Sequence, residues 1–188
     1  MNVNHFLENY RLHLFIILSW LALYSFNFFV LAPLTYKTHI SFIFFPAGLR
    51  IAFATIFRME AAIGLFLGSL LTGFIFLENI YRNDVFIFAF LSTFSPIAAV
   101  YSVNFFINIG SKCEYLTLKT AIAISIIYSG YCAFFHNFYI YKKYNISDIE
   151  FIQDTIAMFI GDLTGGFIFL IILASQKNKI INYLIKFK

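Results

Sequence analysis

Charged side chains are scarce in this chain. Only 12% of its 188 residues are Asp, Glu, Lys or Arg, whereas 61% are hydrophobic and the mean hydropathy is +0.84. Soluble globular domains carry about 25% charged residues, so half of the expected water-facing surface is missing. A soluble core of this length cannot bury so many apolar residues. The composition therefore predicts an integral membrane protein whose main partner is the lipid bilayer.

Dense basic runs and clusters of cysteine are also missing. The formal net charge of +4 is spread along the chain, which leaves no footprint for nucleic-acid binding. Cys113 and Cys132 are too few and too far apart for a metal site, and no metal or other cofactor is expected. The N-terminus lacks a cleavage pattern of small residues, so the first apolar run is expected to be retained. Most of the 27 Phe and 12 Tyr are expected to face lipid.

Long apolar runs account for most of the chain. A helix needs about 20 mostly apolar residues to cross a bilayer, and about six runs qualify. They cover residues 13–33, 40–57, 61–77, 85–107, 120–139 and 151–175. The predicted fold is therefore an all-α polytopic bundle of about six transmembrane helices. It forms one domain, residues 13–175, between a short N-terminal segment, 1–12, and a basic tail, 176–188. The tail is expected either to lie on an anionic leaflet or to act as a stop-transfer flank.

The distribution of Lys and Arg predicts the orientation. With six spans, both termini share one side of the membrane with the second and fourth connections. Eight basic residues fall on that side: Arg11, Arg58, Lys112, Lys119, Lys177, Lys179, Lys186 and Lys188. Four fall on the other side: Lys37, Arg82, Lys142 and Lys143. Because cytoplasmic loops are enriched in Lys and Arg, both termini are predicted to be cytoplasmic.

Small residues recur four apart in two of the predicted helices. Gly64 and Gly68 lie in one, and Gly161, Gly165 and Gly166 lie in the last. Such spacing lets membrane helices approach closely. These glycines are interpreted first as packing positions within the bundle and second as a dimer face.

One arginine and one aspartate fall in the middle of predicted spans. Arg50 follows Pro46 and Gly48 in the stretch FFPAGLR and lies about 15 Å into its helix. Pro46 and Gly48 are expected to break or bend the start of this helix so that Arg50 turns inward. Asp162 lies about 16 Å into the last helix, which runs in the same direction. A lone charge at that depth is costly, and a pair recovers much of the cost. Arg50 and Asp162 are therefore predicted to face each other, either as a structural ion pair or as a ligand or proton site.

Three further polar residues are predicted nearer the outer surface. His136 on the fifth helix, Asp154 on the sixth and His39 in the first connection are expected to rim an outward-facing vestibule. The alternative for His136 is an interfacial histidine with satisfied hydrogen bonds. For Asp154 it is a simple charge near a helix N-terminus.

Residues 40–73 resemble the core of a known family. The stretch FPAG from Phe45 to Gly48, the basic turn FRME from Phe57 to Glu60 and FLGSLLTG from Phe66 to Gly73 are similar to the MASE1 membrane-associated sensor domain. The family's last helix carries an acidic residue followed by glycine, and FIGDLTGG, residues 159–166, is similar in kind and position. The resemblance covers about a third of the chain.

The resemblance implies a sensory or ligand-binding module in a bacterial inner or plasma membrane. Two features depart from the family: Phe45 stands where Trp is usual, and about six spans replace about eight. The family domain precedes a signalling output domain, which has no counterpart here. Signalling would then require a separate partner on the cytoplasmic side.

Two other functional classes were weighed. A six-helix substrate-capture subunit of a transporter agrees with length and topology, but the first helix lacks the Ala-x-x-x-Ala stripe of the energy-coupling-factor subunits that it would resemble. An intramembrane enzyme is not expected. Asp162 follows FIG rather than Gly-x-Gly, no Tyr-Asp occurs, and neither a Ser/His pair at glycine-rich depth nor a His/Glu zinc motif is present.

Overall fold

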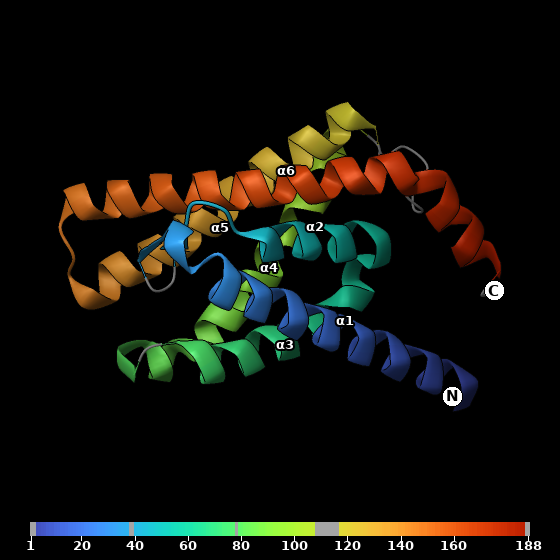
Figure 1. The fold of residues 1–188 in the computed structure, drawn as a ribbon, viewed down its shortest axis with the longest axis horizontal. Coiled ribbons are helices and arrows are strands. Elements are labelled where there is room, and N and C mark those ends of the chain that lie inside the picture. The colour runs from blue at the N-terminus through green and yellow to red at the C-terminus, as the bar shows by residue number, and fades with distance from the viewer. Residues whose placement is uncertain (1–2, 38–39, 78, 108–116, 187–188) are drawn as a thin grey trace.

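Six α-helices make up most of the structure, a computed structural model that describes residues 3–37, 40–77, 79–107 and 117–186 (Figure 1). The helices are α1 (Val3–Val30), α2 (Phe45–Phe57), α3 (Ala61–Phe76), α4 (Val85–Ile107), α5 (Leu118–Tyr144) and α6 (Asp148–Lys186). Short 3₁₀ turns flank them: η1 (Ala32–Leu34), η2 (Arg58–Glu60) and η3 (Asn79–Asp84). The strands β1 (Thr35–Lys37) and β2 (Ile40–Ser41) pair antiparallel between α1 and α2. The all-α fold class is confirmed.

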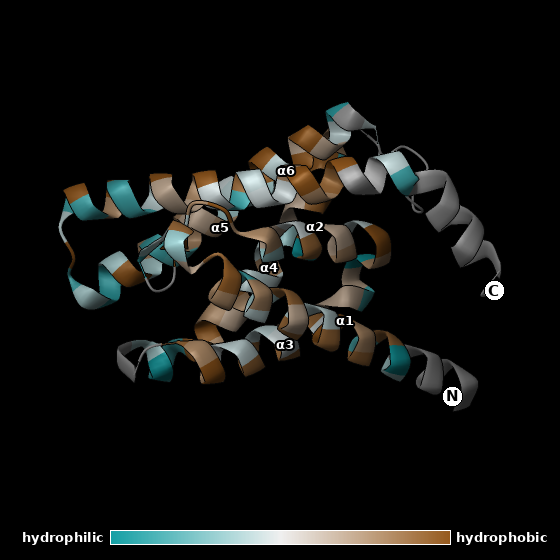
Figure 2. Cartoon of the chain, viewed as in Figure 1, coloured by the Kyte–Doolittle hydropathy of each residue, from teal (hydrophilic) through white to brown (hydrophobic). Residues whose placement is uncertain are grey.

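Successive helices run in opposite directions, so both termini lie at one end of the bundle (Figure 1). We call this the terminal end. The opposite end carries the β1–β2 hairpin, η3 and the connection between α5 and α6, and we call it the hairpin end. Figure 2 shows that hydrophilic residues are most frequent towards the ends of the helices.

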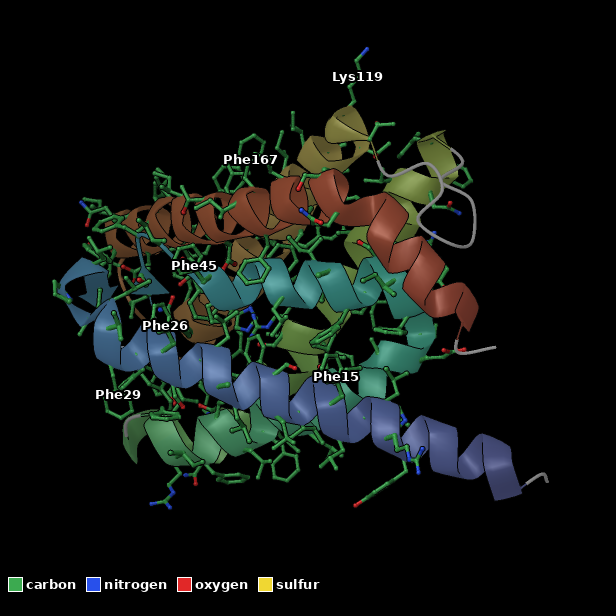
Figure 3. The ribbon with its side chains drawn as sticks, turned by 45° about the vertical axis from the view of Figure 1, so that its right-hand side comes forward. Phe15, Phe26, Phe29, Phe45, Lys119 and Phe167 are labelled. Carbon is green, nitrogen blue, oxygen red and sulfur yellow. The ribbon has the colours of Figure 1, made fainter. Side chains whose placement is uncertain are left out.

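Five segments of the described residues are long and apolar enough to cross a membrane. They are Tyr10–Val30, Phe45–Phe76, Tyr81–Phe106, Lys119–Tyr144 and Asp148–Ile171. Large apolar side chains cover the outside of the helices, as Figure 3 shows for Phe15, Phe26 and Phe29 on α1, which are 57%, 45% and 69% exposed. A multi-pass membrane protein is the class that has such a surface.

The second predicted span, residues 40–57, is wrong in its first part. Residues Ile40–Ser41 pair with β1, and the helix begins only at Phe45. With 13 residues, α2 is about 20 Å long, short of a hydrocarbon core of about 30 Å. It turns back at η2 into α3, and together they form the single 32-residue candidate segment. Five candidate segments therefore stand where six separate spans were predicted.

Helices α3 and α4 begin and end close to the predicted residues, whereas α1, α5 and α6 are longer than predicted. The predicted ranges 61–77 and 85–107 compare with Ala61–Phe76 and Val85–Ile107. Helix α5 begins at Leu118, because Thr117 and Thr120 form a capping box there. It ends at Tyr144, because Asn145 adopts the left-handed conformation. Helix α6 continues unbroken through most of the predicted tail to Lys186.

Helix α2 forms the centre of the bundle. One core cluster joins Ala47, Ile51 and Ala54 of α2 to residues of α4, α5 and α6. A second joins Phe53 of α2 to Ile16 of α1 and to the start of α3. Because α2 is covered on both sides, a polar residue on it must find its partners inside the protein.

Glycines fix the close approaches between these helices. A Cβ at Gly64 or Gly68 would lie 2.8–2.9 Å from Ile16 or Trp20 of α1. A Cβ at Gly161 or Gly165 would overlap the carbonyl oxygens of Ser41 and Phe44, and one at Gly48 would overlap Phe169. A Cβ at Gly166 would lie 2.8 Å from Ile51. All six glycines are thus packing positions within the chain, which agrees with the first interpretation of their spacing.

Candidate functional site

A cavity of about 120 Å³ lies inside the hairpin half of the bundle. A water needs about 10–15 Å³ of such volume, so the space suffices for several waters or one small ligand. Its polar lining comes from every helix and from the hairpin: Asn27, Thr35, Ser41, Arg50, Ser69, Thr72, Ser92, His136 and Asp162. Its aromatic lining consists of Tyr24, Phe28, Phe44 and Phe88.

Arg50 of α2 lines this cavity and is only 5% exposed. Its guanidinium carbon lies 4.3 Å from the centre of the Trp20 ring and 5.7 Å from that of Phe44. Its Nη1 donates to the Tyr128 hydroxyl at 3.3 Å. The Nε atom has no hydrogen-bond partner among the described residues. The charge is therefore held by aromatic faces and one hydroxyl, with a donor left over.

Asp162 of α6 lines the same cavity and is 1% exposed. The charge of Arg50 acts on its carboxylate through space. Within the described part of the chain, its Oδ2 atom accepts no hydrogen bond. Asp162 therefore has a free hydrogen-bond acceptor in the cavity wall, just as Arg50 has a free donor.

The predicted direct ion pair between Arg50 and Asp162 is not formed. The ion pairs within 4.0 Å that join described residues involve Lys37 and Lys143 instead. The physical reason is that Trp20, Tyr128 and Cys132 engage the guanidinium. The prediction that both charges lie at one level inside the bundle agrees with the structure, because both line one cavity.

The chain reaches this cavity through a non-helical segment, residues 42–44, rather than through a kinked helix. Two hydrogen bonds hold the segment on α6: the Phe44 amide donates to the Gly161 carbonyl at 3.1 Å, and the Thr164 hydroxyl donates to the Phe42 carbonyl at 3.1 Å. Pro46 lies in the first turn of α2, where no amide donor is needed, and so starts the helix instead of bending it.

His136 of α5 lies in the cavity wall rather than at an outer rim. Its Nδ1 donates to the Cys132 carbonyl at 2.9 Å, and its Nε2 forms a hydrogen bond with the Ser92 hydroxyl at 3.2 Å. The ring stacks on Phe88 at 5.8 Å between centroids. Sequence reasoning did not foresee this Ser–His contact, because it joins two helices.

The Ser92–His136 contact has the geometry of a nucleophile beside a base, but it lacks the rest of an acyl-transfer site. Ser92 lies inside α4, where backbone amides are engaged in the helix and cannot form an oxyanion hole. Pro96, four residues on, removes one donor and frees the Ser92 carbonyl from the helical ladder. These groups add polarity to the cavity wall.

Asp154 does not rim an open vestibule. It is 2% exposed and binds Lys37 at 2.8 Å, while Glu150 binds the same ammonium at 2.6 Å. Partial burial alone would lower the pKa of Lys37, but the bonds and charges of these carboxylates outweigh it and raise that pKa. The Lys37 link fastens the hairpin to α6 above the cavity. His39, the third predicted vestibule residue, lies outside the described residues.

Besides Asp162 and Asp154, a third carboxylate is buried, and sequence reasoning missed it. Asp84, 1% exposed at the start of α4, accepts from the Tyr139 hydroxyl at 2.8 Å, from Lys143 and from Tyr144. These bonds tie α4 to the end of α5. The sequence contained a signal, because a Tyr-Lys-Lys-Tyr run ends one helix and an aspartate begins another at the same side of the membrane.

Metal binding finds no support in the residues whose structure is described, where no three His, Cys, Asp or Glu side chains come together. Comparisons with known proteins add no family: no protein-family model, no curated protein and no solved structure matches this chain.

Proposed function

We propose that this chain is a multi-pass membrane protein that binds a small polar ligand in the cavity between Arg50 and Asp162. One observation carries the proposal. Two opposite charges, 5% and 1% exposed, line one cavity without forming an ion pair among the described residues, and each has a polar atom without a partner. Buried polar groups are normally satisfied, so a pair of unsatisfied charges points to a missing occupant.

The cost of these charges supports a binding role over a purely structural one. A charge at membrane depth costs about 2.5–3.5 kcal/mol even on insertion scales. A structural staple offsets that cost best in a direct, hydrogen-bonded pair. Here the two side chains are kept apart by their other contacts, which is the arrangement expected when a ligand completes the site.

In this proposal the cavity opens away from the cytoplasm. The Lys and Arg bias favours cytoplasmic termini, and the cavity lies in the half of the bundle opposite to them. The proposed topology has six membrane-inserted helices, of which α2 and α3 are short and form a hairpin. A bacterial inner or plasma membrane is the proposed location.

The proposed role is sensory, following the resemblance of residues 40–73 to the MASE1 sensor domains. Helix α6 lines the cavity with Asp162 and continues to Lys186 at the terminal end. A ligand that draws α2 and α6 together would therefore change the position of a helix that leaves the membrane. A separate cytoplasmic protein would respond to that change.

A transport component is the second candidate. It is favoured by segment 42–44, which brings non-helical backbone to a polar cavity inside the bundle, as in many transporters. The two candidates differ in flux. A transporter in proteoliposomes moves its ligand across the membrane, whereas a sensor binds it without net movement.

The first test compares the wild type with Arg50→Leu and with Arg50→Leu/Asp162→Asn, each purified and heated with a panel of small polar compounds. We expect one compound class to raise the melting temperature of the wild type only. The single variant should melt lower than the double variant, because it leaves Asp162 as a buried charge with no opposite charge beside it. Arg11→Gln, an exposed charge change at the terminal end, is the matched control. A double variant as stable as the wild type, with no compound stabilising the wild type, would contradict the proposal.

A further inference from the structure

We infer that the ligand of this cavity is a small zwitterion, a molecule that carries one carboxylate and one ammonium group. The inference rests on the proposed function and specifies its substrate class. It follows from the signs, positions and remaining bonding capacity of the groups in the cavity wall.

The charges of the cavity wall balance. Of the described residues in the lining, Arg50 carries a positive charge and Asp162 a negative one. A ligand with a single charge would engage one of the two protein charges and leave the other uncompensated in a site of low dielectric. A ligand with both charges compensates both.

The free bonding positions have matching signs. In the described structure the spare Arg50 atom, Nε, is a donor, and the spare Asp162 atom, Oδ2, is an acceptor. A ligand carboxylate accepts from guanidinium donors in a short, charge-assisted bond, and an ammonium donates to a carboxylate. Because both side chains line one cavity, a ligand in it can contact both.

The rest of the wall suits the same ligand. The lining includes the aromatic rings of Tyr24 and Phe28, and aromatic rings attract an ammonium group, whereas the Trp20 ring is occupied by Arg50. The Ser69 hydroxyl of α3, which has no hydrogen-bond partner among the described residues, offers one more hydrogen bond. The volume of about 120 Å³ has room for a small ligand of this kind.

The test compares small molecules that carry both charged groups with molecules that carry only one of them. Straight-chain amino acids with one, two or three carbons between carboxylate and ammonium form one set, and propionate and propylamine are the matched single-charge probes. Binding to the purified wild type is measured by titration calorimetry and by the shift of melting temperature at constant ionic strength. We expect one amino acid of the set to bind at least about tenfold more tightly than either single-charge probe, because each charged hydrogen bond lost is worth about a factor of ten or more.

Two charge-removing variants should change the preference in opposite directions. Asp162→Asn removes the partner of the ammonium, so propionate should approach or exceed the amino acid. Arg50→Gln removes the partner of the carboxylate, so propylamine should do so. Arg11→Gln and Asp148→Asn change exposed charges outside the cavity and should leave the wild-type preference unchanged. Circular dichroism and gel filtration verify folding, and the wild-type comparison decides the question even if a variant does not fold.

Two outcomes separate this inference from the proposed function. If propionate or propylamine alone binds the wild type as tightly as every amino acid, the site exists but its ligand is an anion or a cation, and the zwitterion is excluded. If none of these probes binds, the zwitterion is also excluded, and the wider panel of polar compounds then decides whether the site binds anything.

Discussion

Arg50 shows how a single residue can be charged at the centre of an apolar bundle. Its guanidinium lies over the Trp20 ring at 4.3 Å, and Tyr128 accepts one of its hydrogen bonds. A desolvated cation–π contact is worth about 2 kcal/mol. Trp20 is itself fixed, since its Nε1 donates to Thr72 at 3.1 Å. The arginine is therefore positioned by neutral groups, and its charge stays available to the cavity.

Gly161 is a second single residue on which the site depends, because the backbone at Ser41, which leads to Arg50, packs directly against it. We predict that Gly161→Ala destabilises the protein by about 1–3 kcal/mol, since the new methyl group overlaps the Ser41 carbonyl oxygen. Thermal melting in detergent measures the effect, and binding of the ligand should weaken with it.

Gly130→Ala is the matched control for this prediction. Gly130 lies inside α5, and a Cβ there meets nothing within 4 Å. Its replacement should leave the melting temperature unchanged or raise it, because Ala favours helix by about 1 kcal/mol over Gly. Equal melting temperatures for the two variants would show that segment 42–44 does not rest on α6.

At the scale of helices and strands, Lys37 links the β1–β2 hairpin to α6. Lys37 binds Asp154 and Glu150, so the β1–β2 hairpin is fastened above the cavity whose wall includes Thr35, Ile40 and Ser41. The carboxylates raise the pKa of Lys37, and Tyr36 adds a ring 5.9 Å from its ammonium. A raised pKa means that this link stabilises the fold fully below the ordinary lysine value and is lost as the pH rises above it.

We predict that the stabilisation provided by Lys37 is lost at alkaline pH. Between neutral pH and about 10.5 the wild type should melt at a higher temperature than Lys37→Ala, and the difference should shrink at higher pH. Lys37→Arg, whose guanidinium stays charged, should keep the difference to higher pH. Parallel melting curves for wild type and Lys37→Ala at every pH would contradict a stabilising role of this link.

Sequence patterns predicted elements better than the contacts between them. The apolar runs located α3 and α4 almost to the residue, since length and hydropathy dominate such helices. The start of α2 was missed because Ile40 and Ser41 are apolar or small and read equally well as helix, and only their pairing with β1 decides otherwise. Lys37 was counted as a topology signal because its partner lies more than a hundred residues away.

At the scale of the whole molecule, polar function is concentrated in the hairpin half. The cavity, the Lys37 link and the Asp84 cluster all lie there, while both termini lie at the other end (Figure 1). Counting residues from the start of each helix was enough to predict that Arg50 and Asp162 lie at one level in the membrane, because both helices run in the same direction. It did not predict Trp20, Tyr128 or Ser92 around them, since side-chain choice between helices depends on packing that one sequence does not display.

The most direct test of the account is whether water reaches this cavity from the side opposite the termini. With Cys113 and Cys132 replaced by serine, Ser69→Cys places a thiol in the cavity wall, and Leu71→Cys places one on the lipid face of α3 two residues away. A membrane-impermeant thiol reagent is added to intact cells, and labelling is read by mass. The account predicts that Ser69→Cys is modified and Leu71→Cys is not, because a thiol in hydrocarbon does not ionise. Equal resistance of both positions would mean a closed, dry interior and would contradict a ligand site between Arg50 and Asp162.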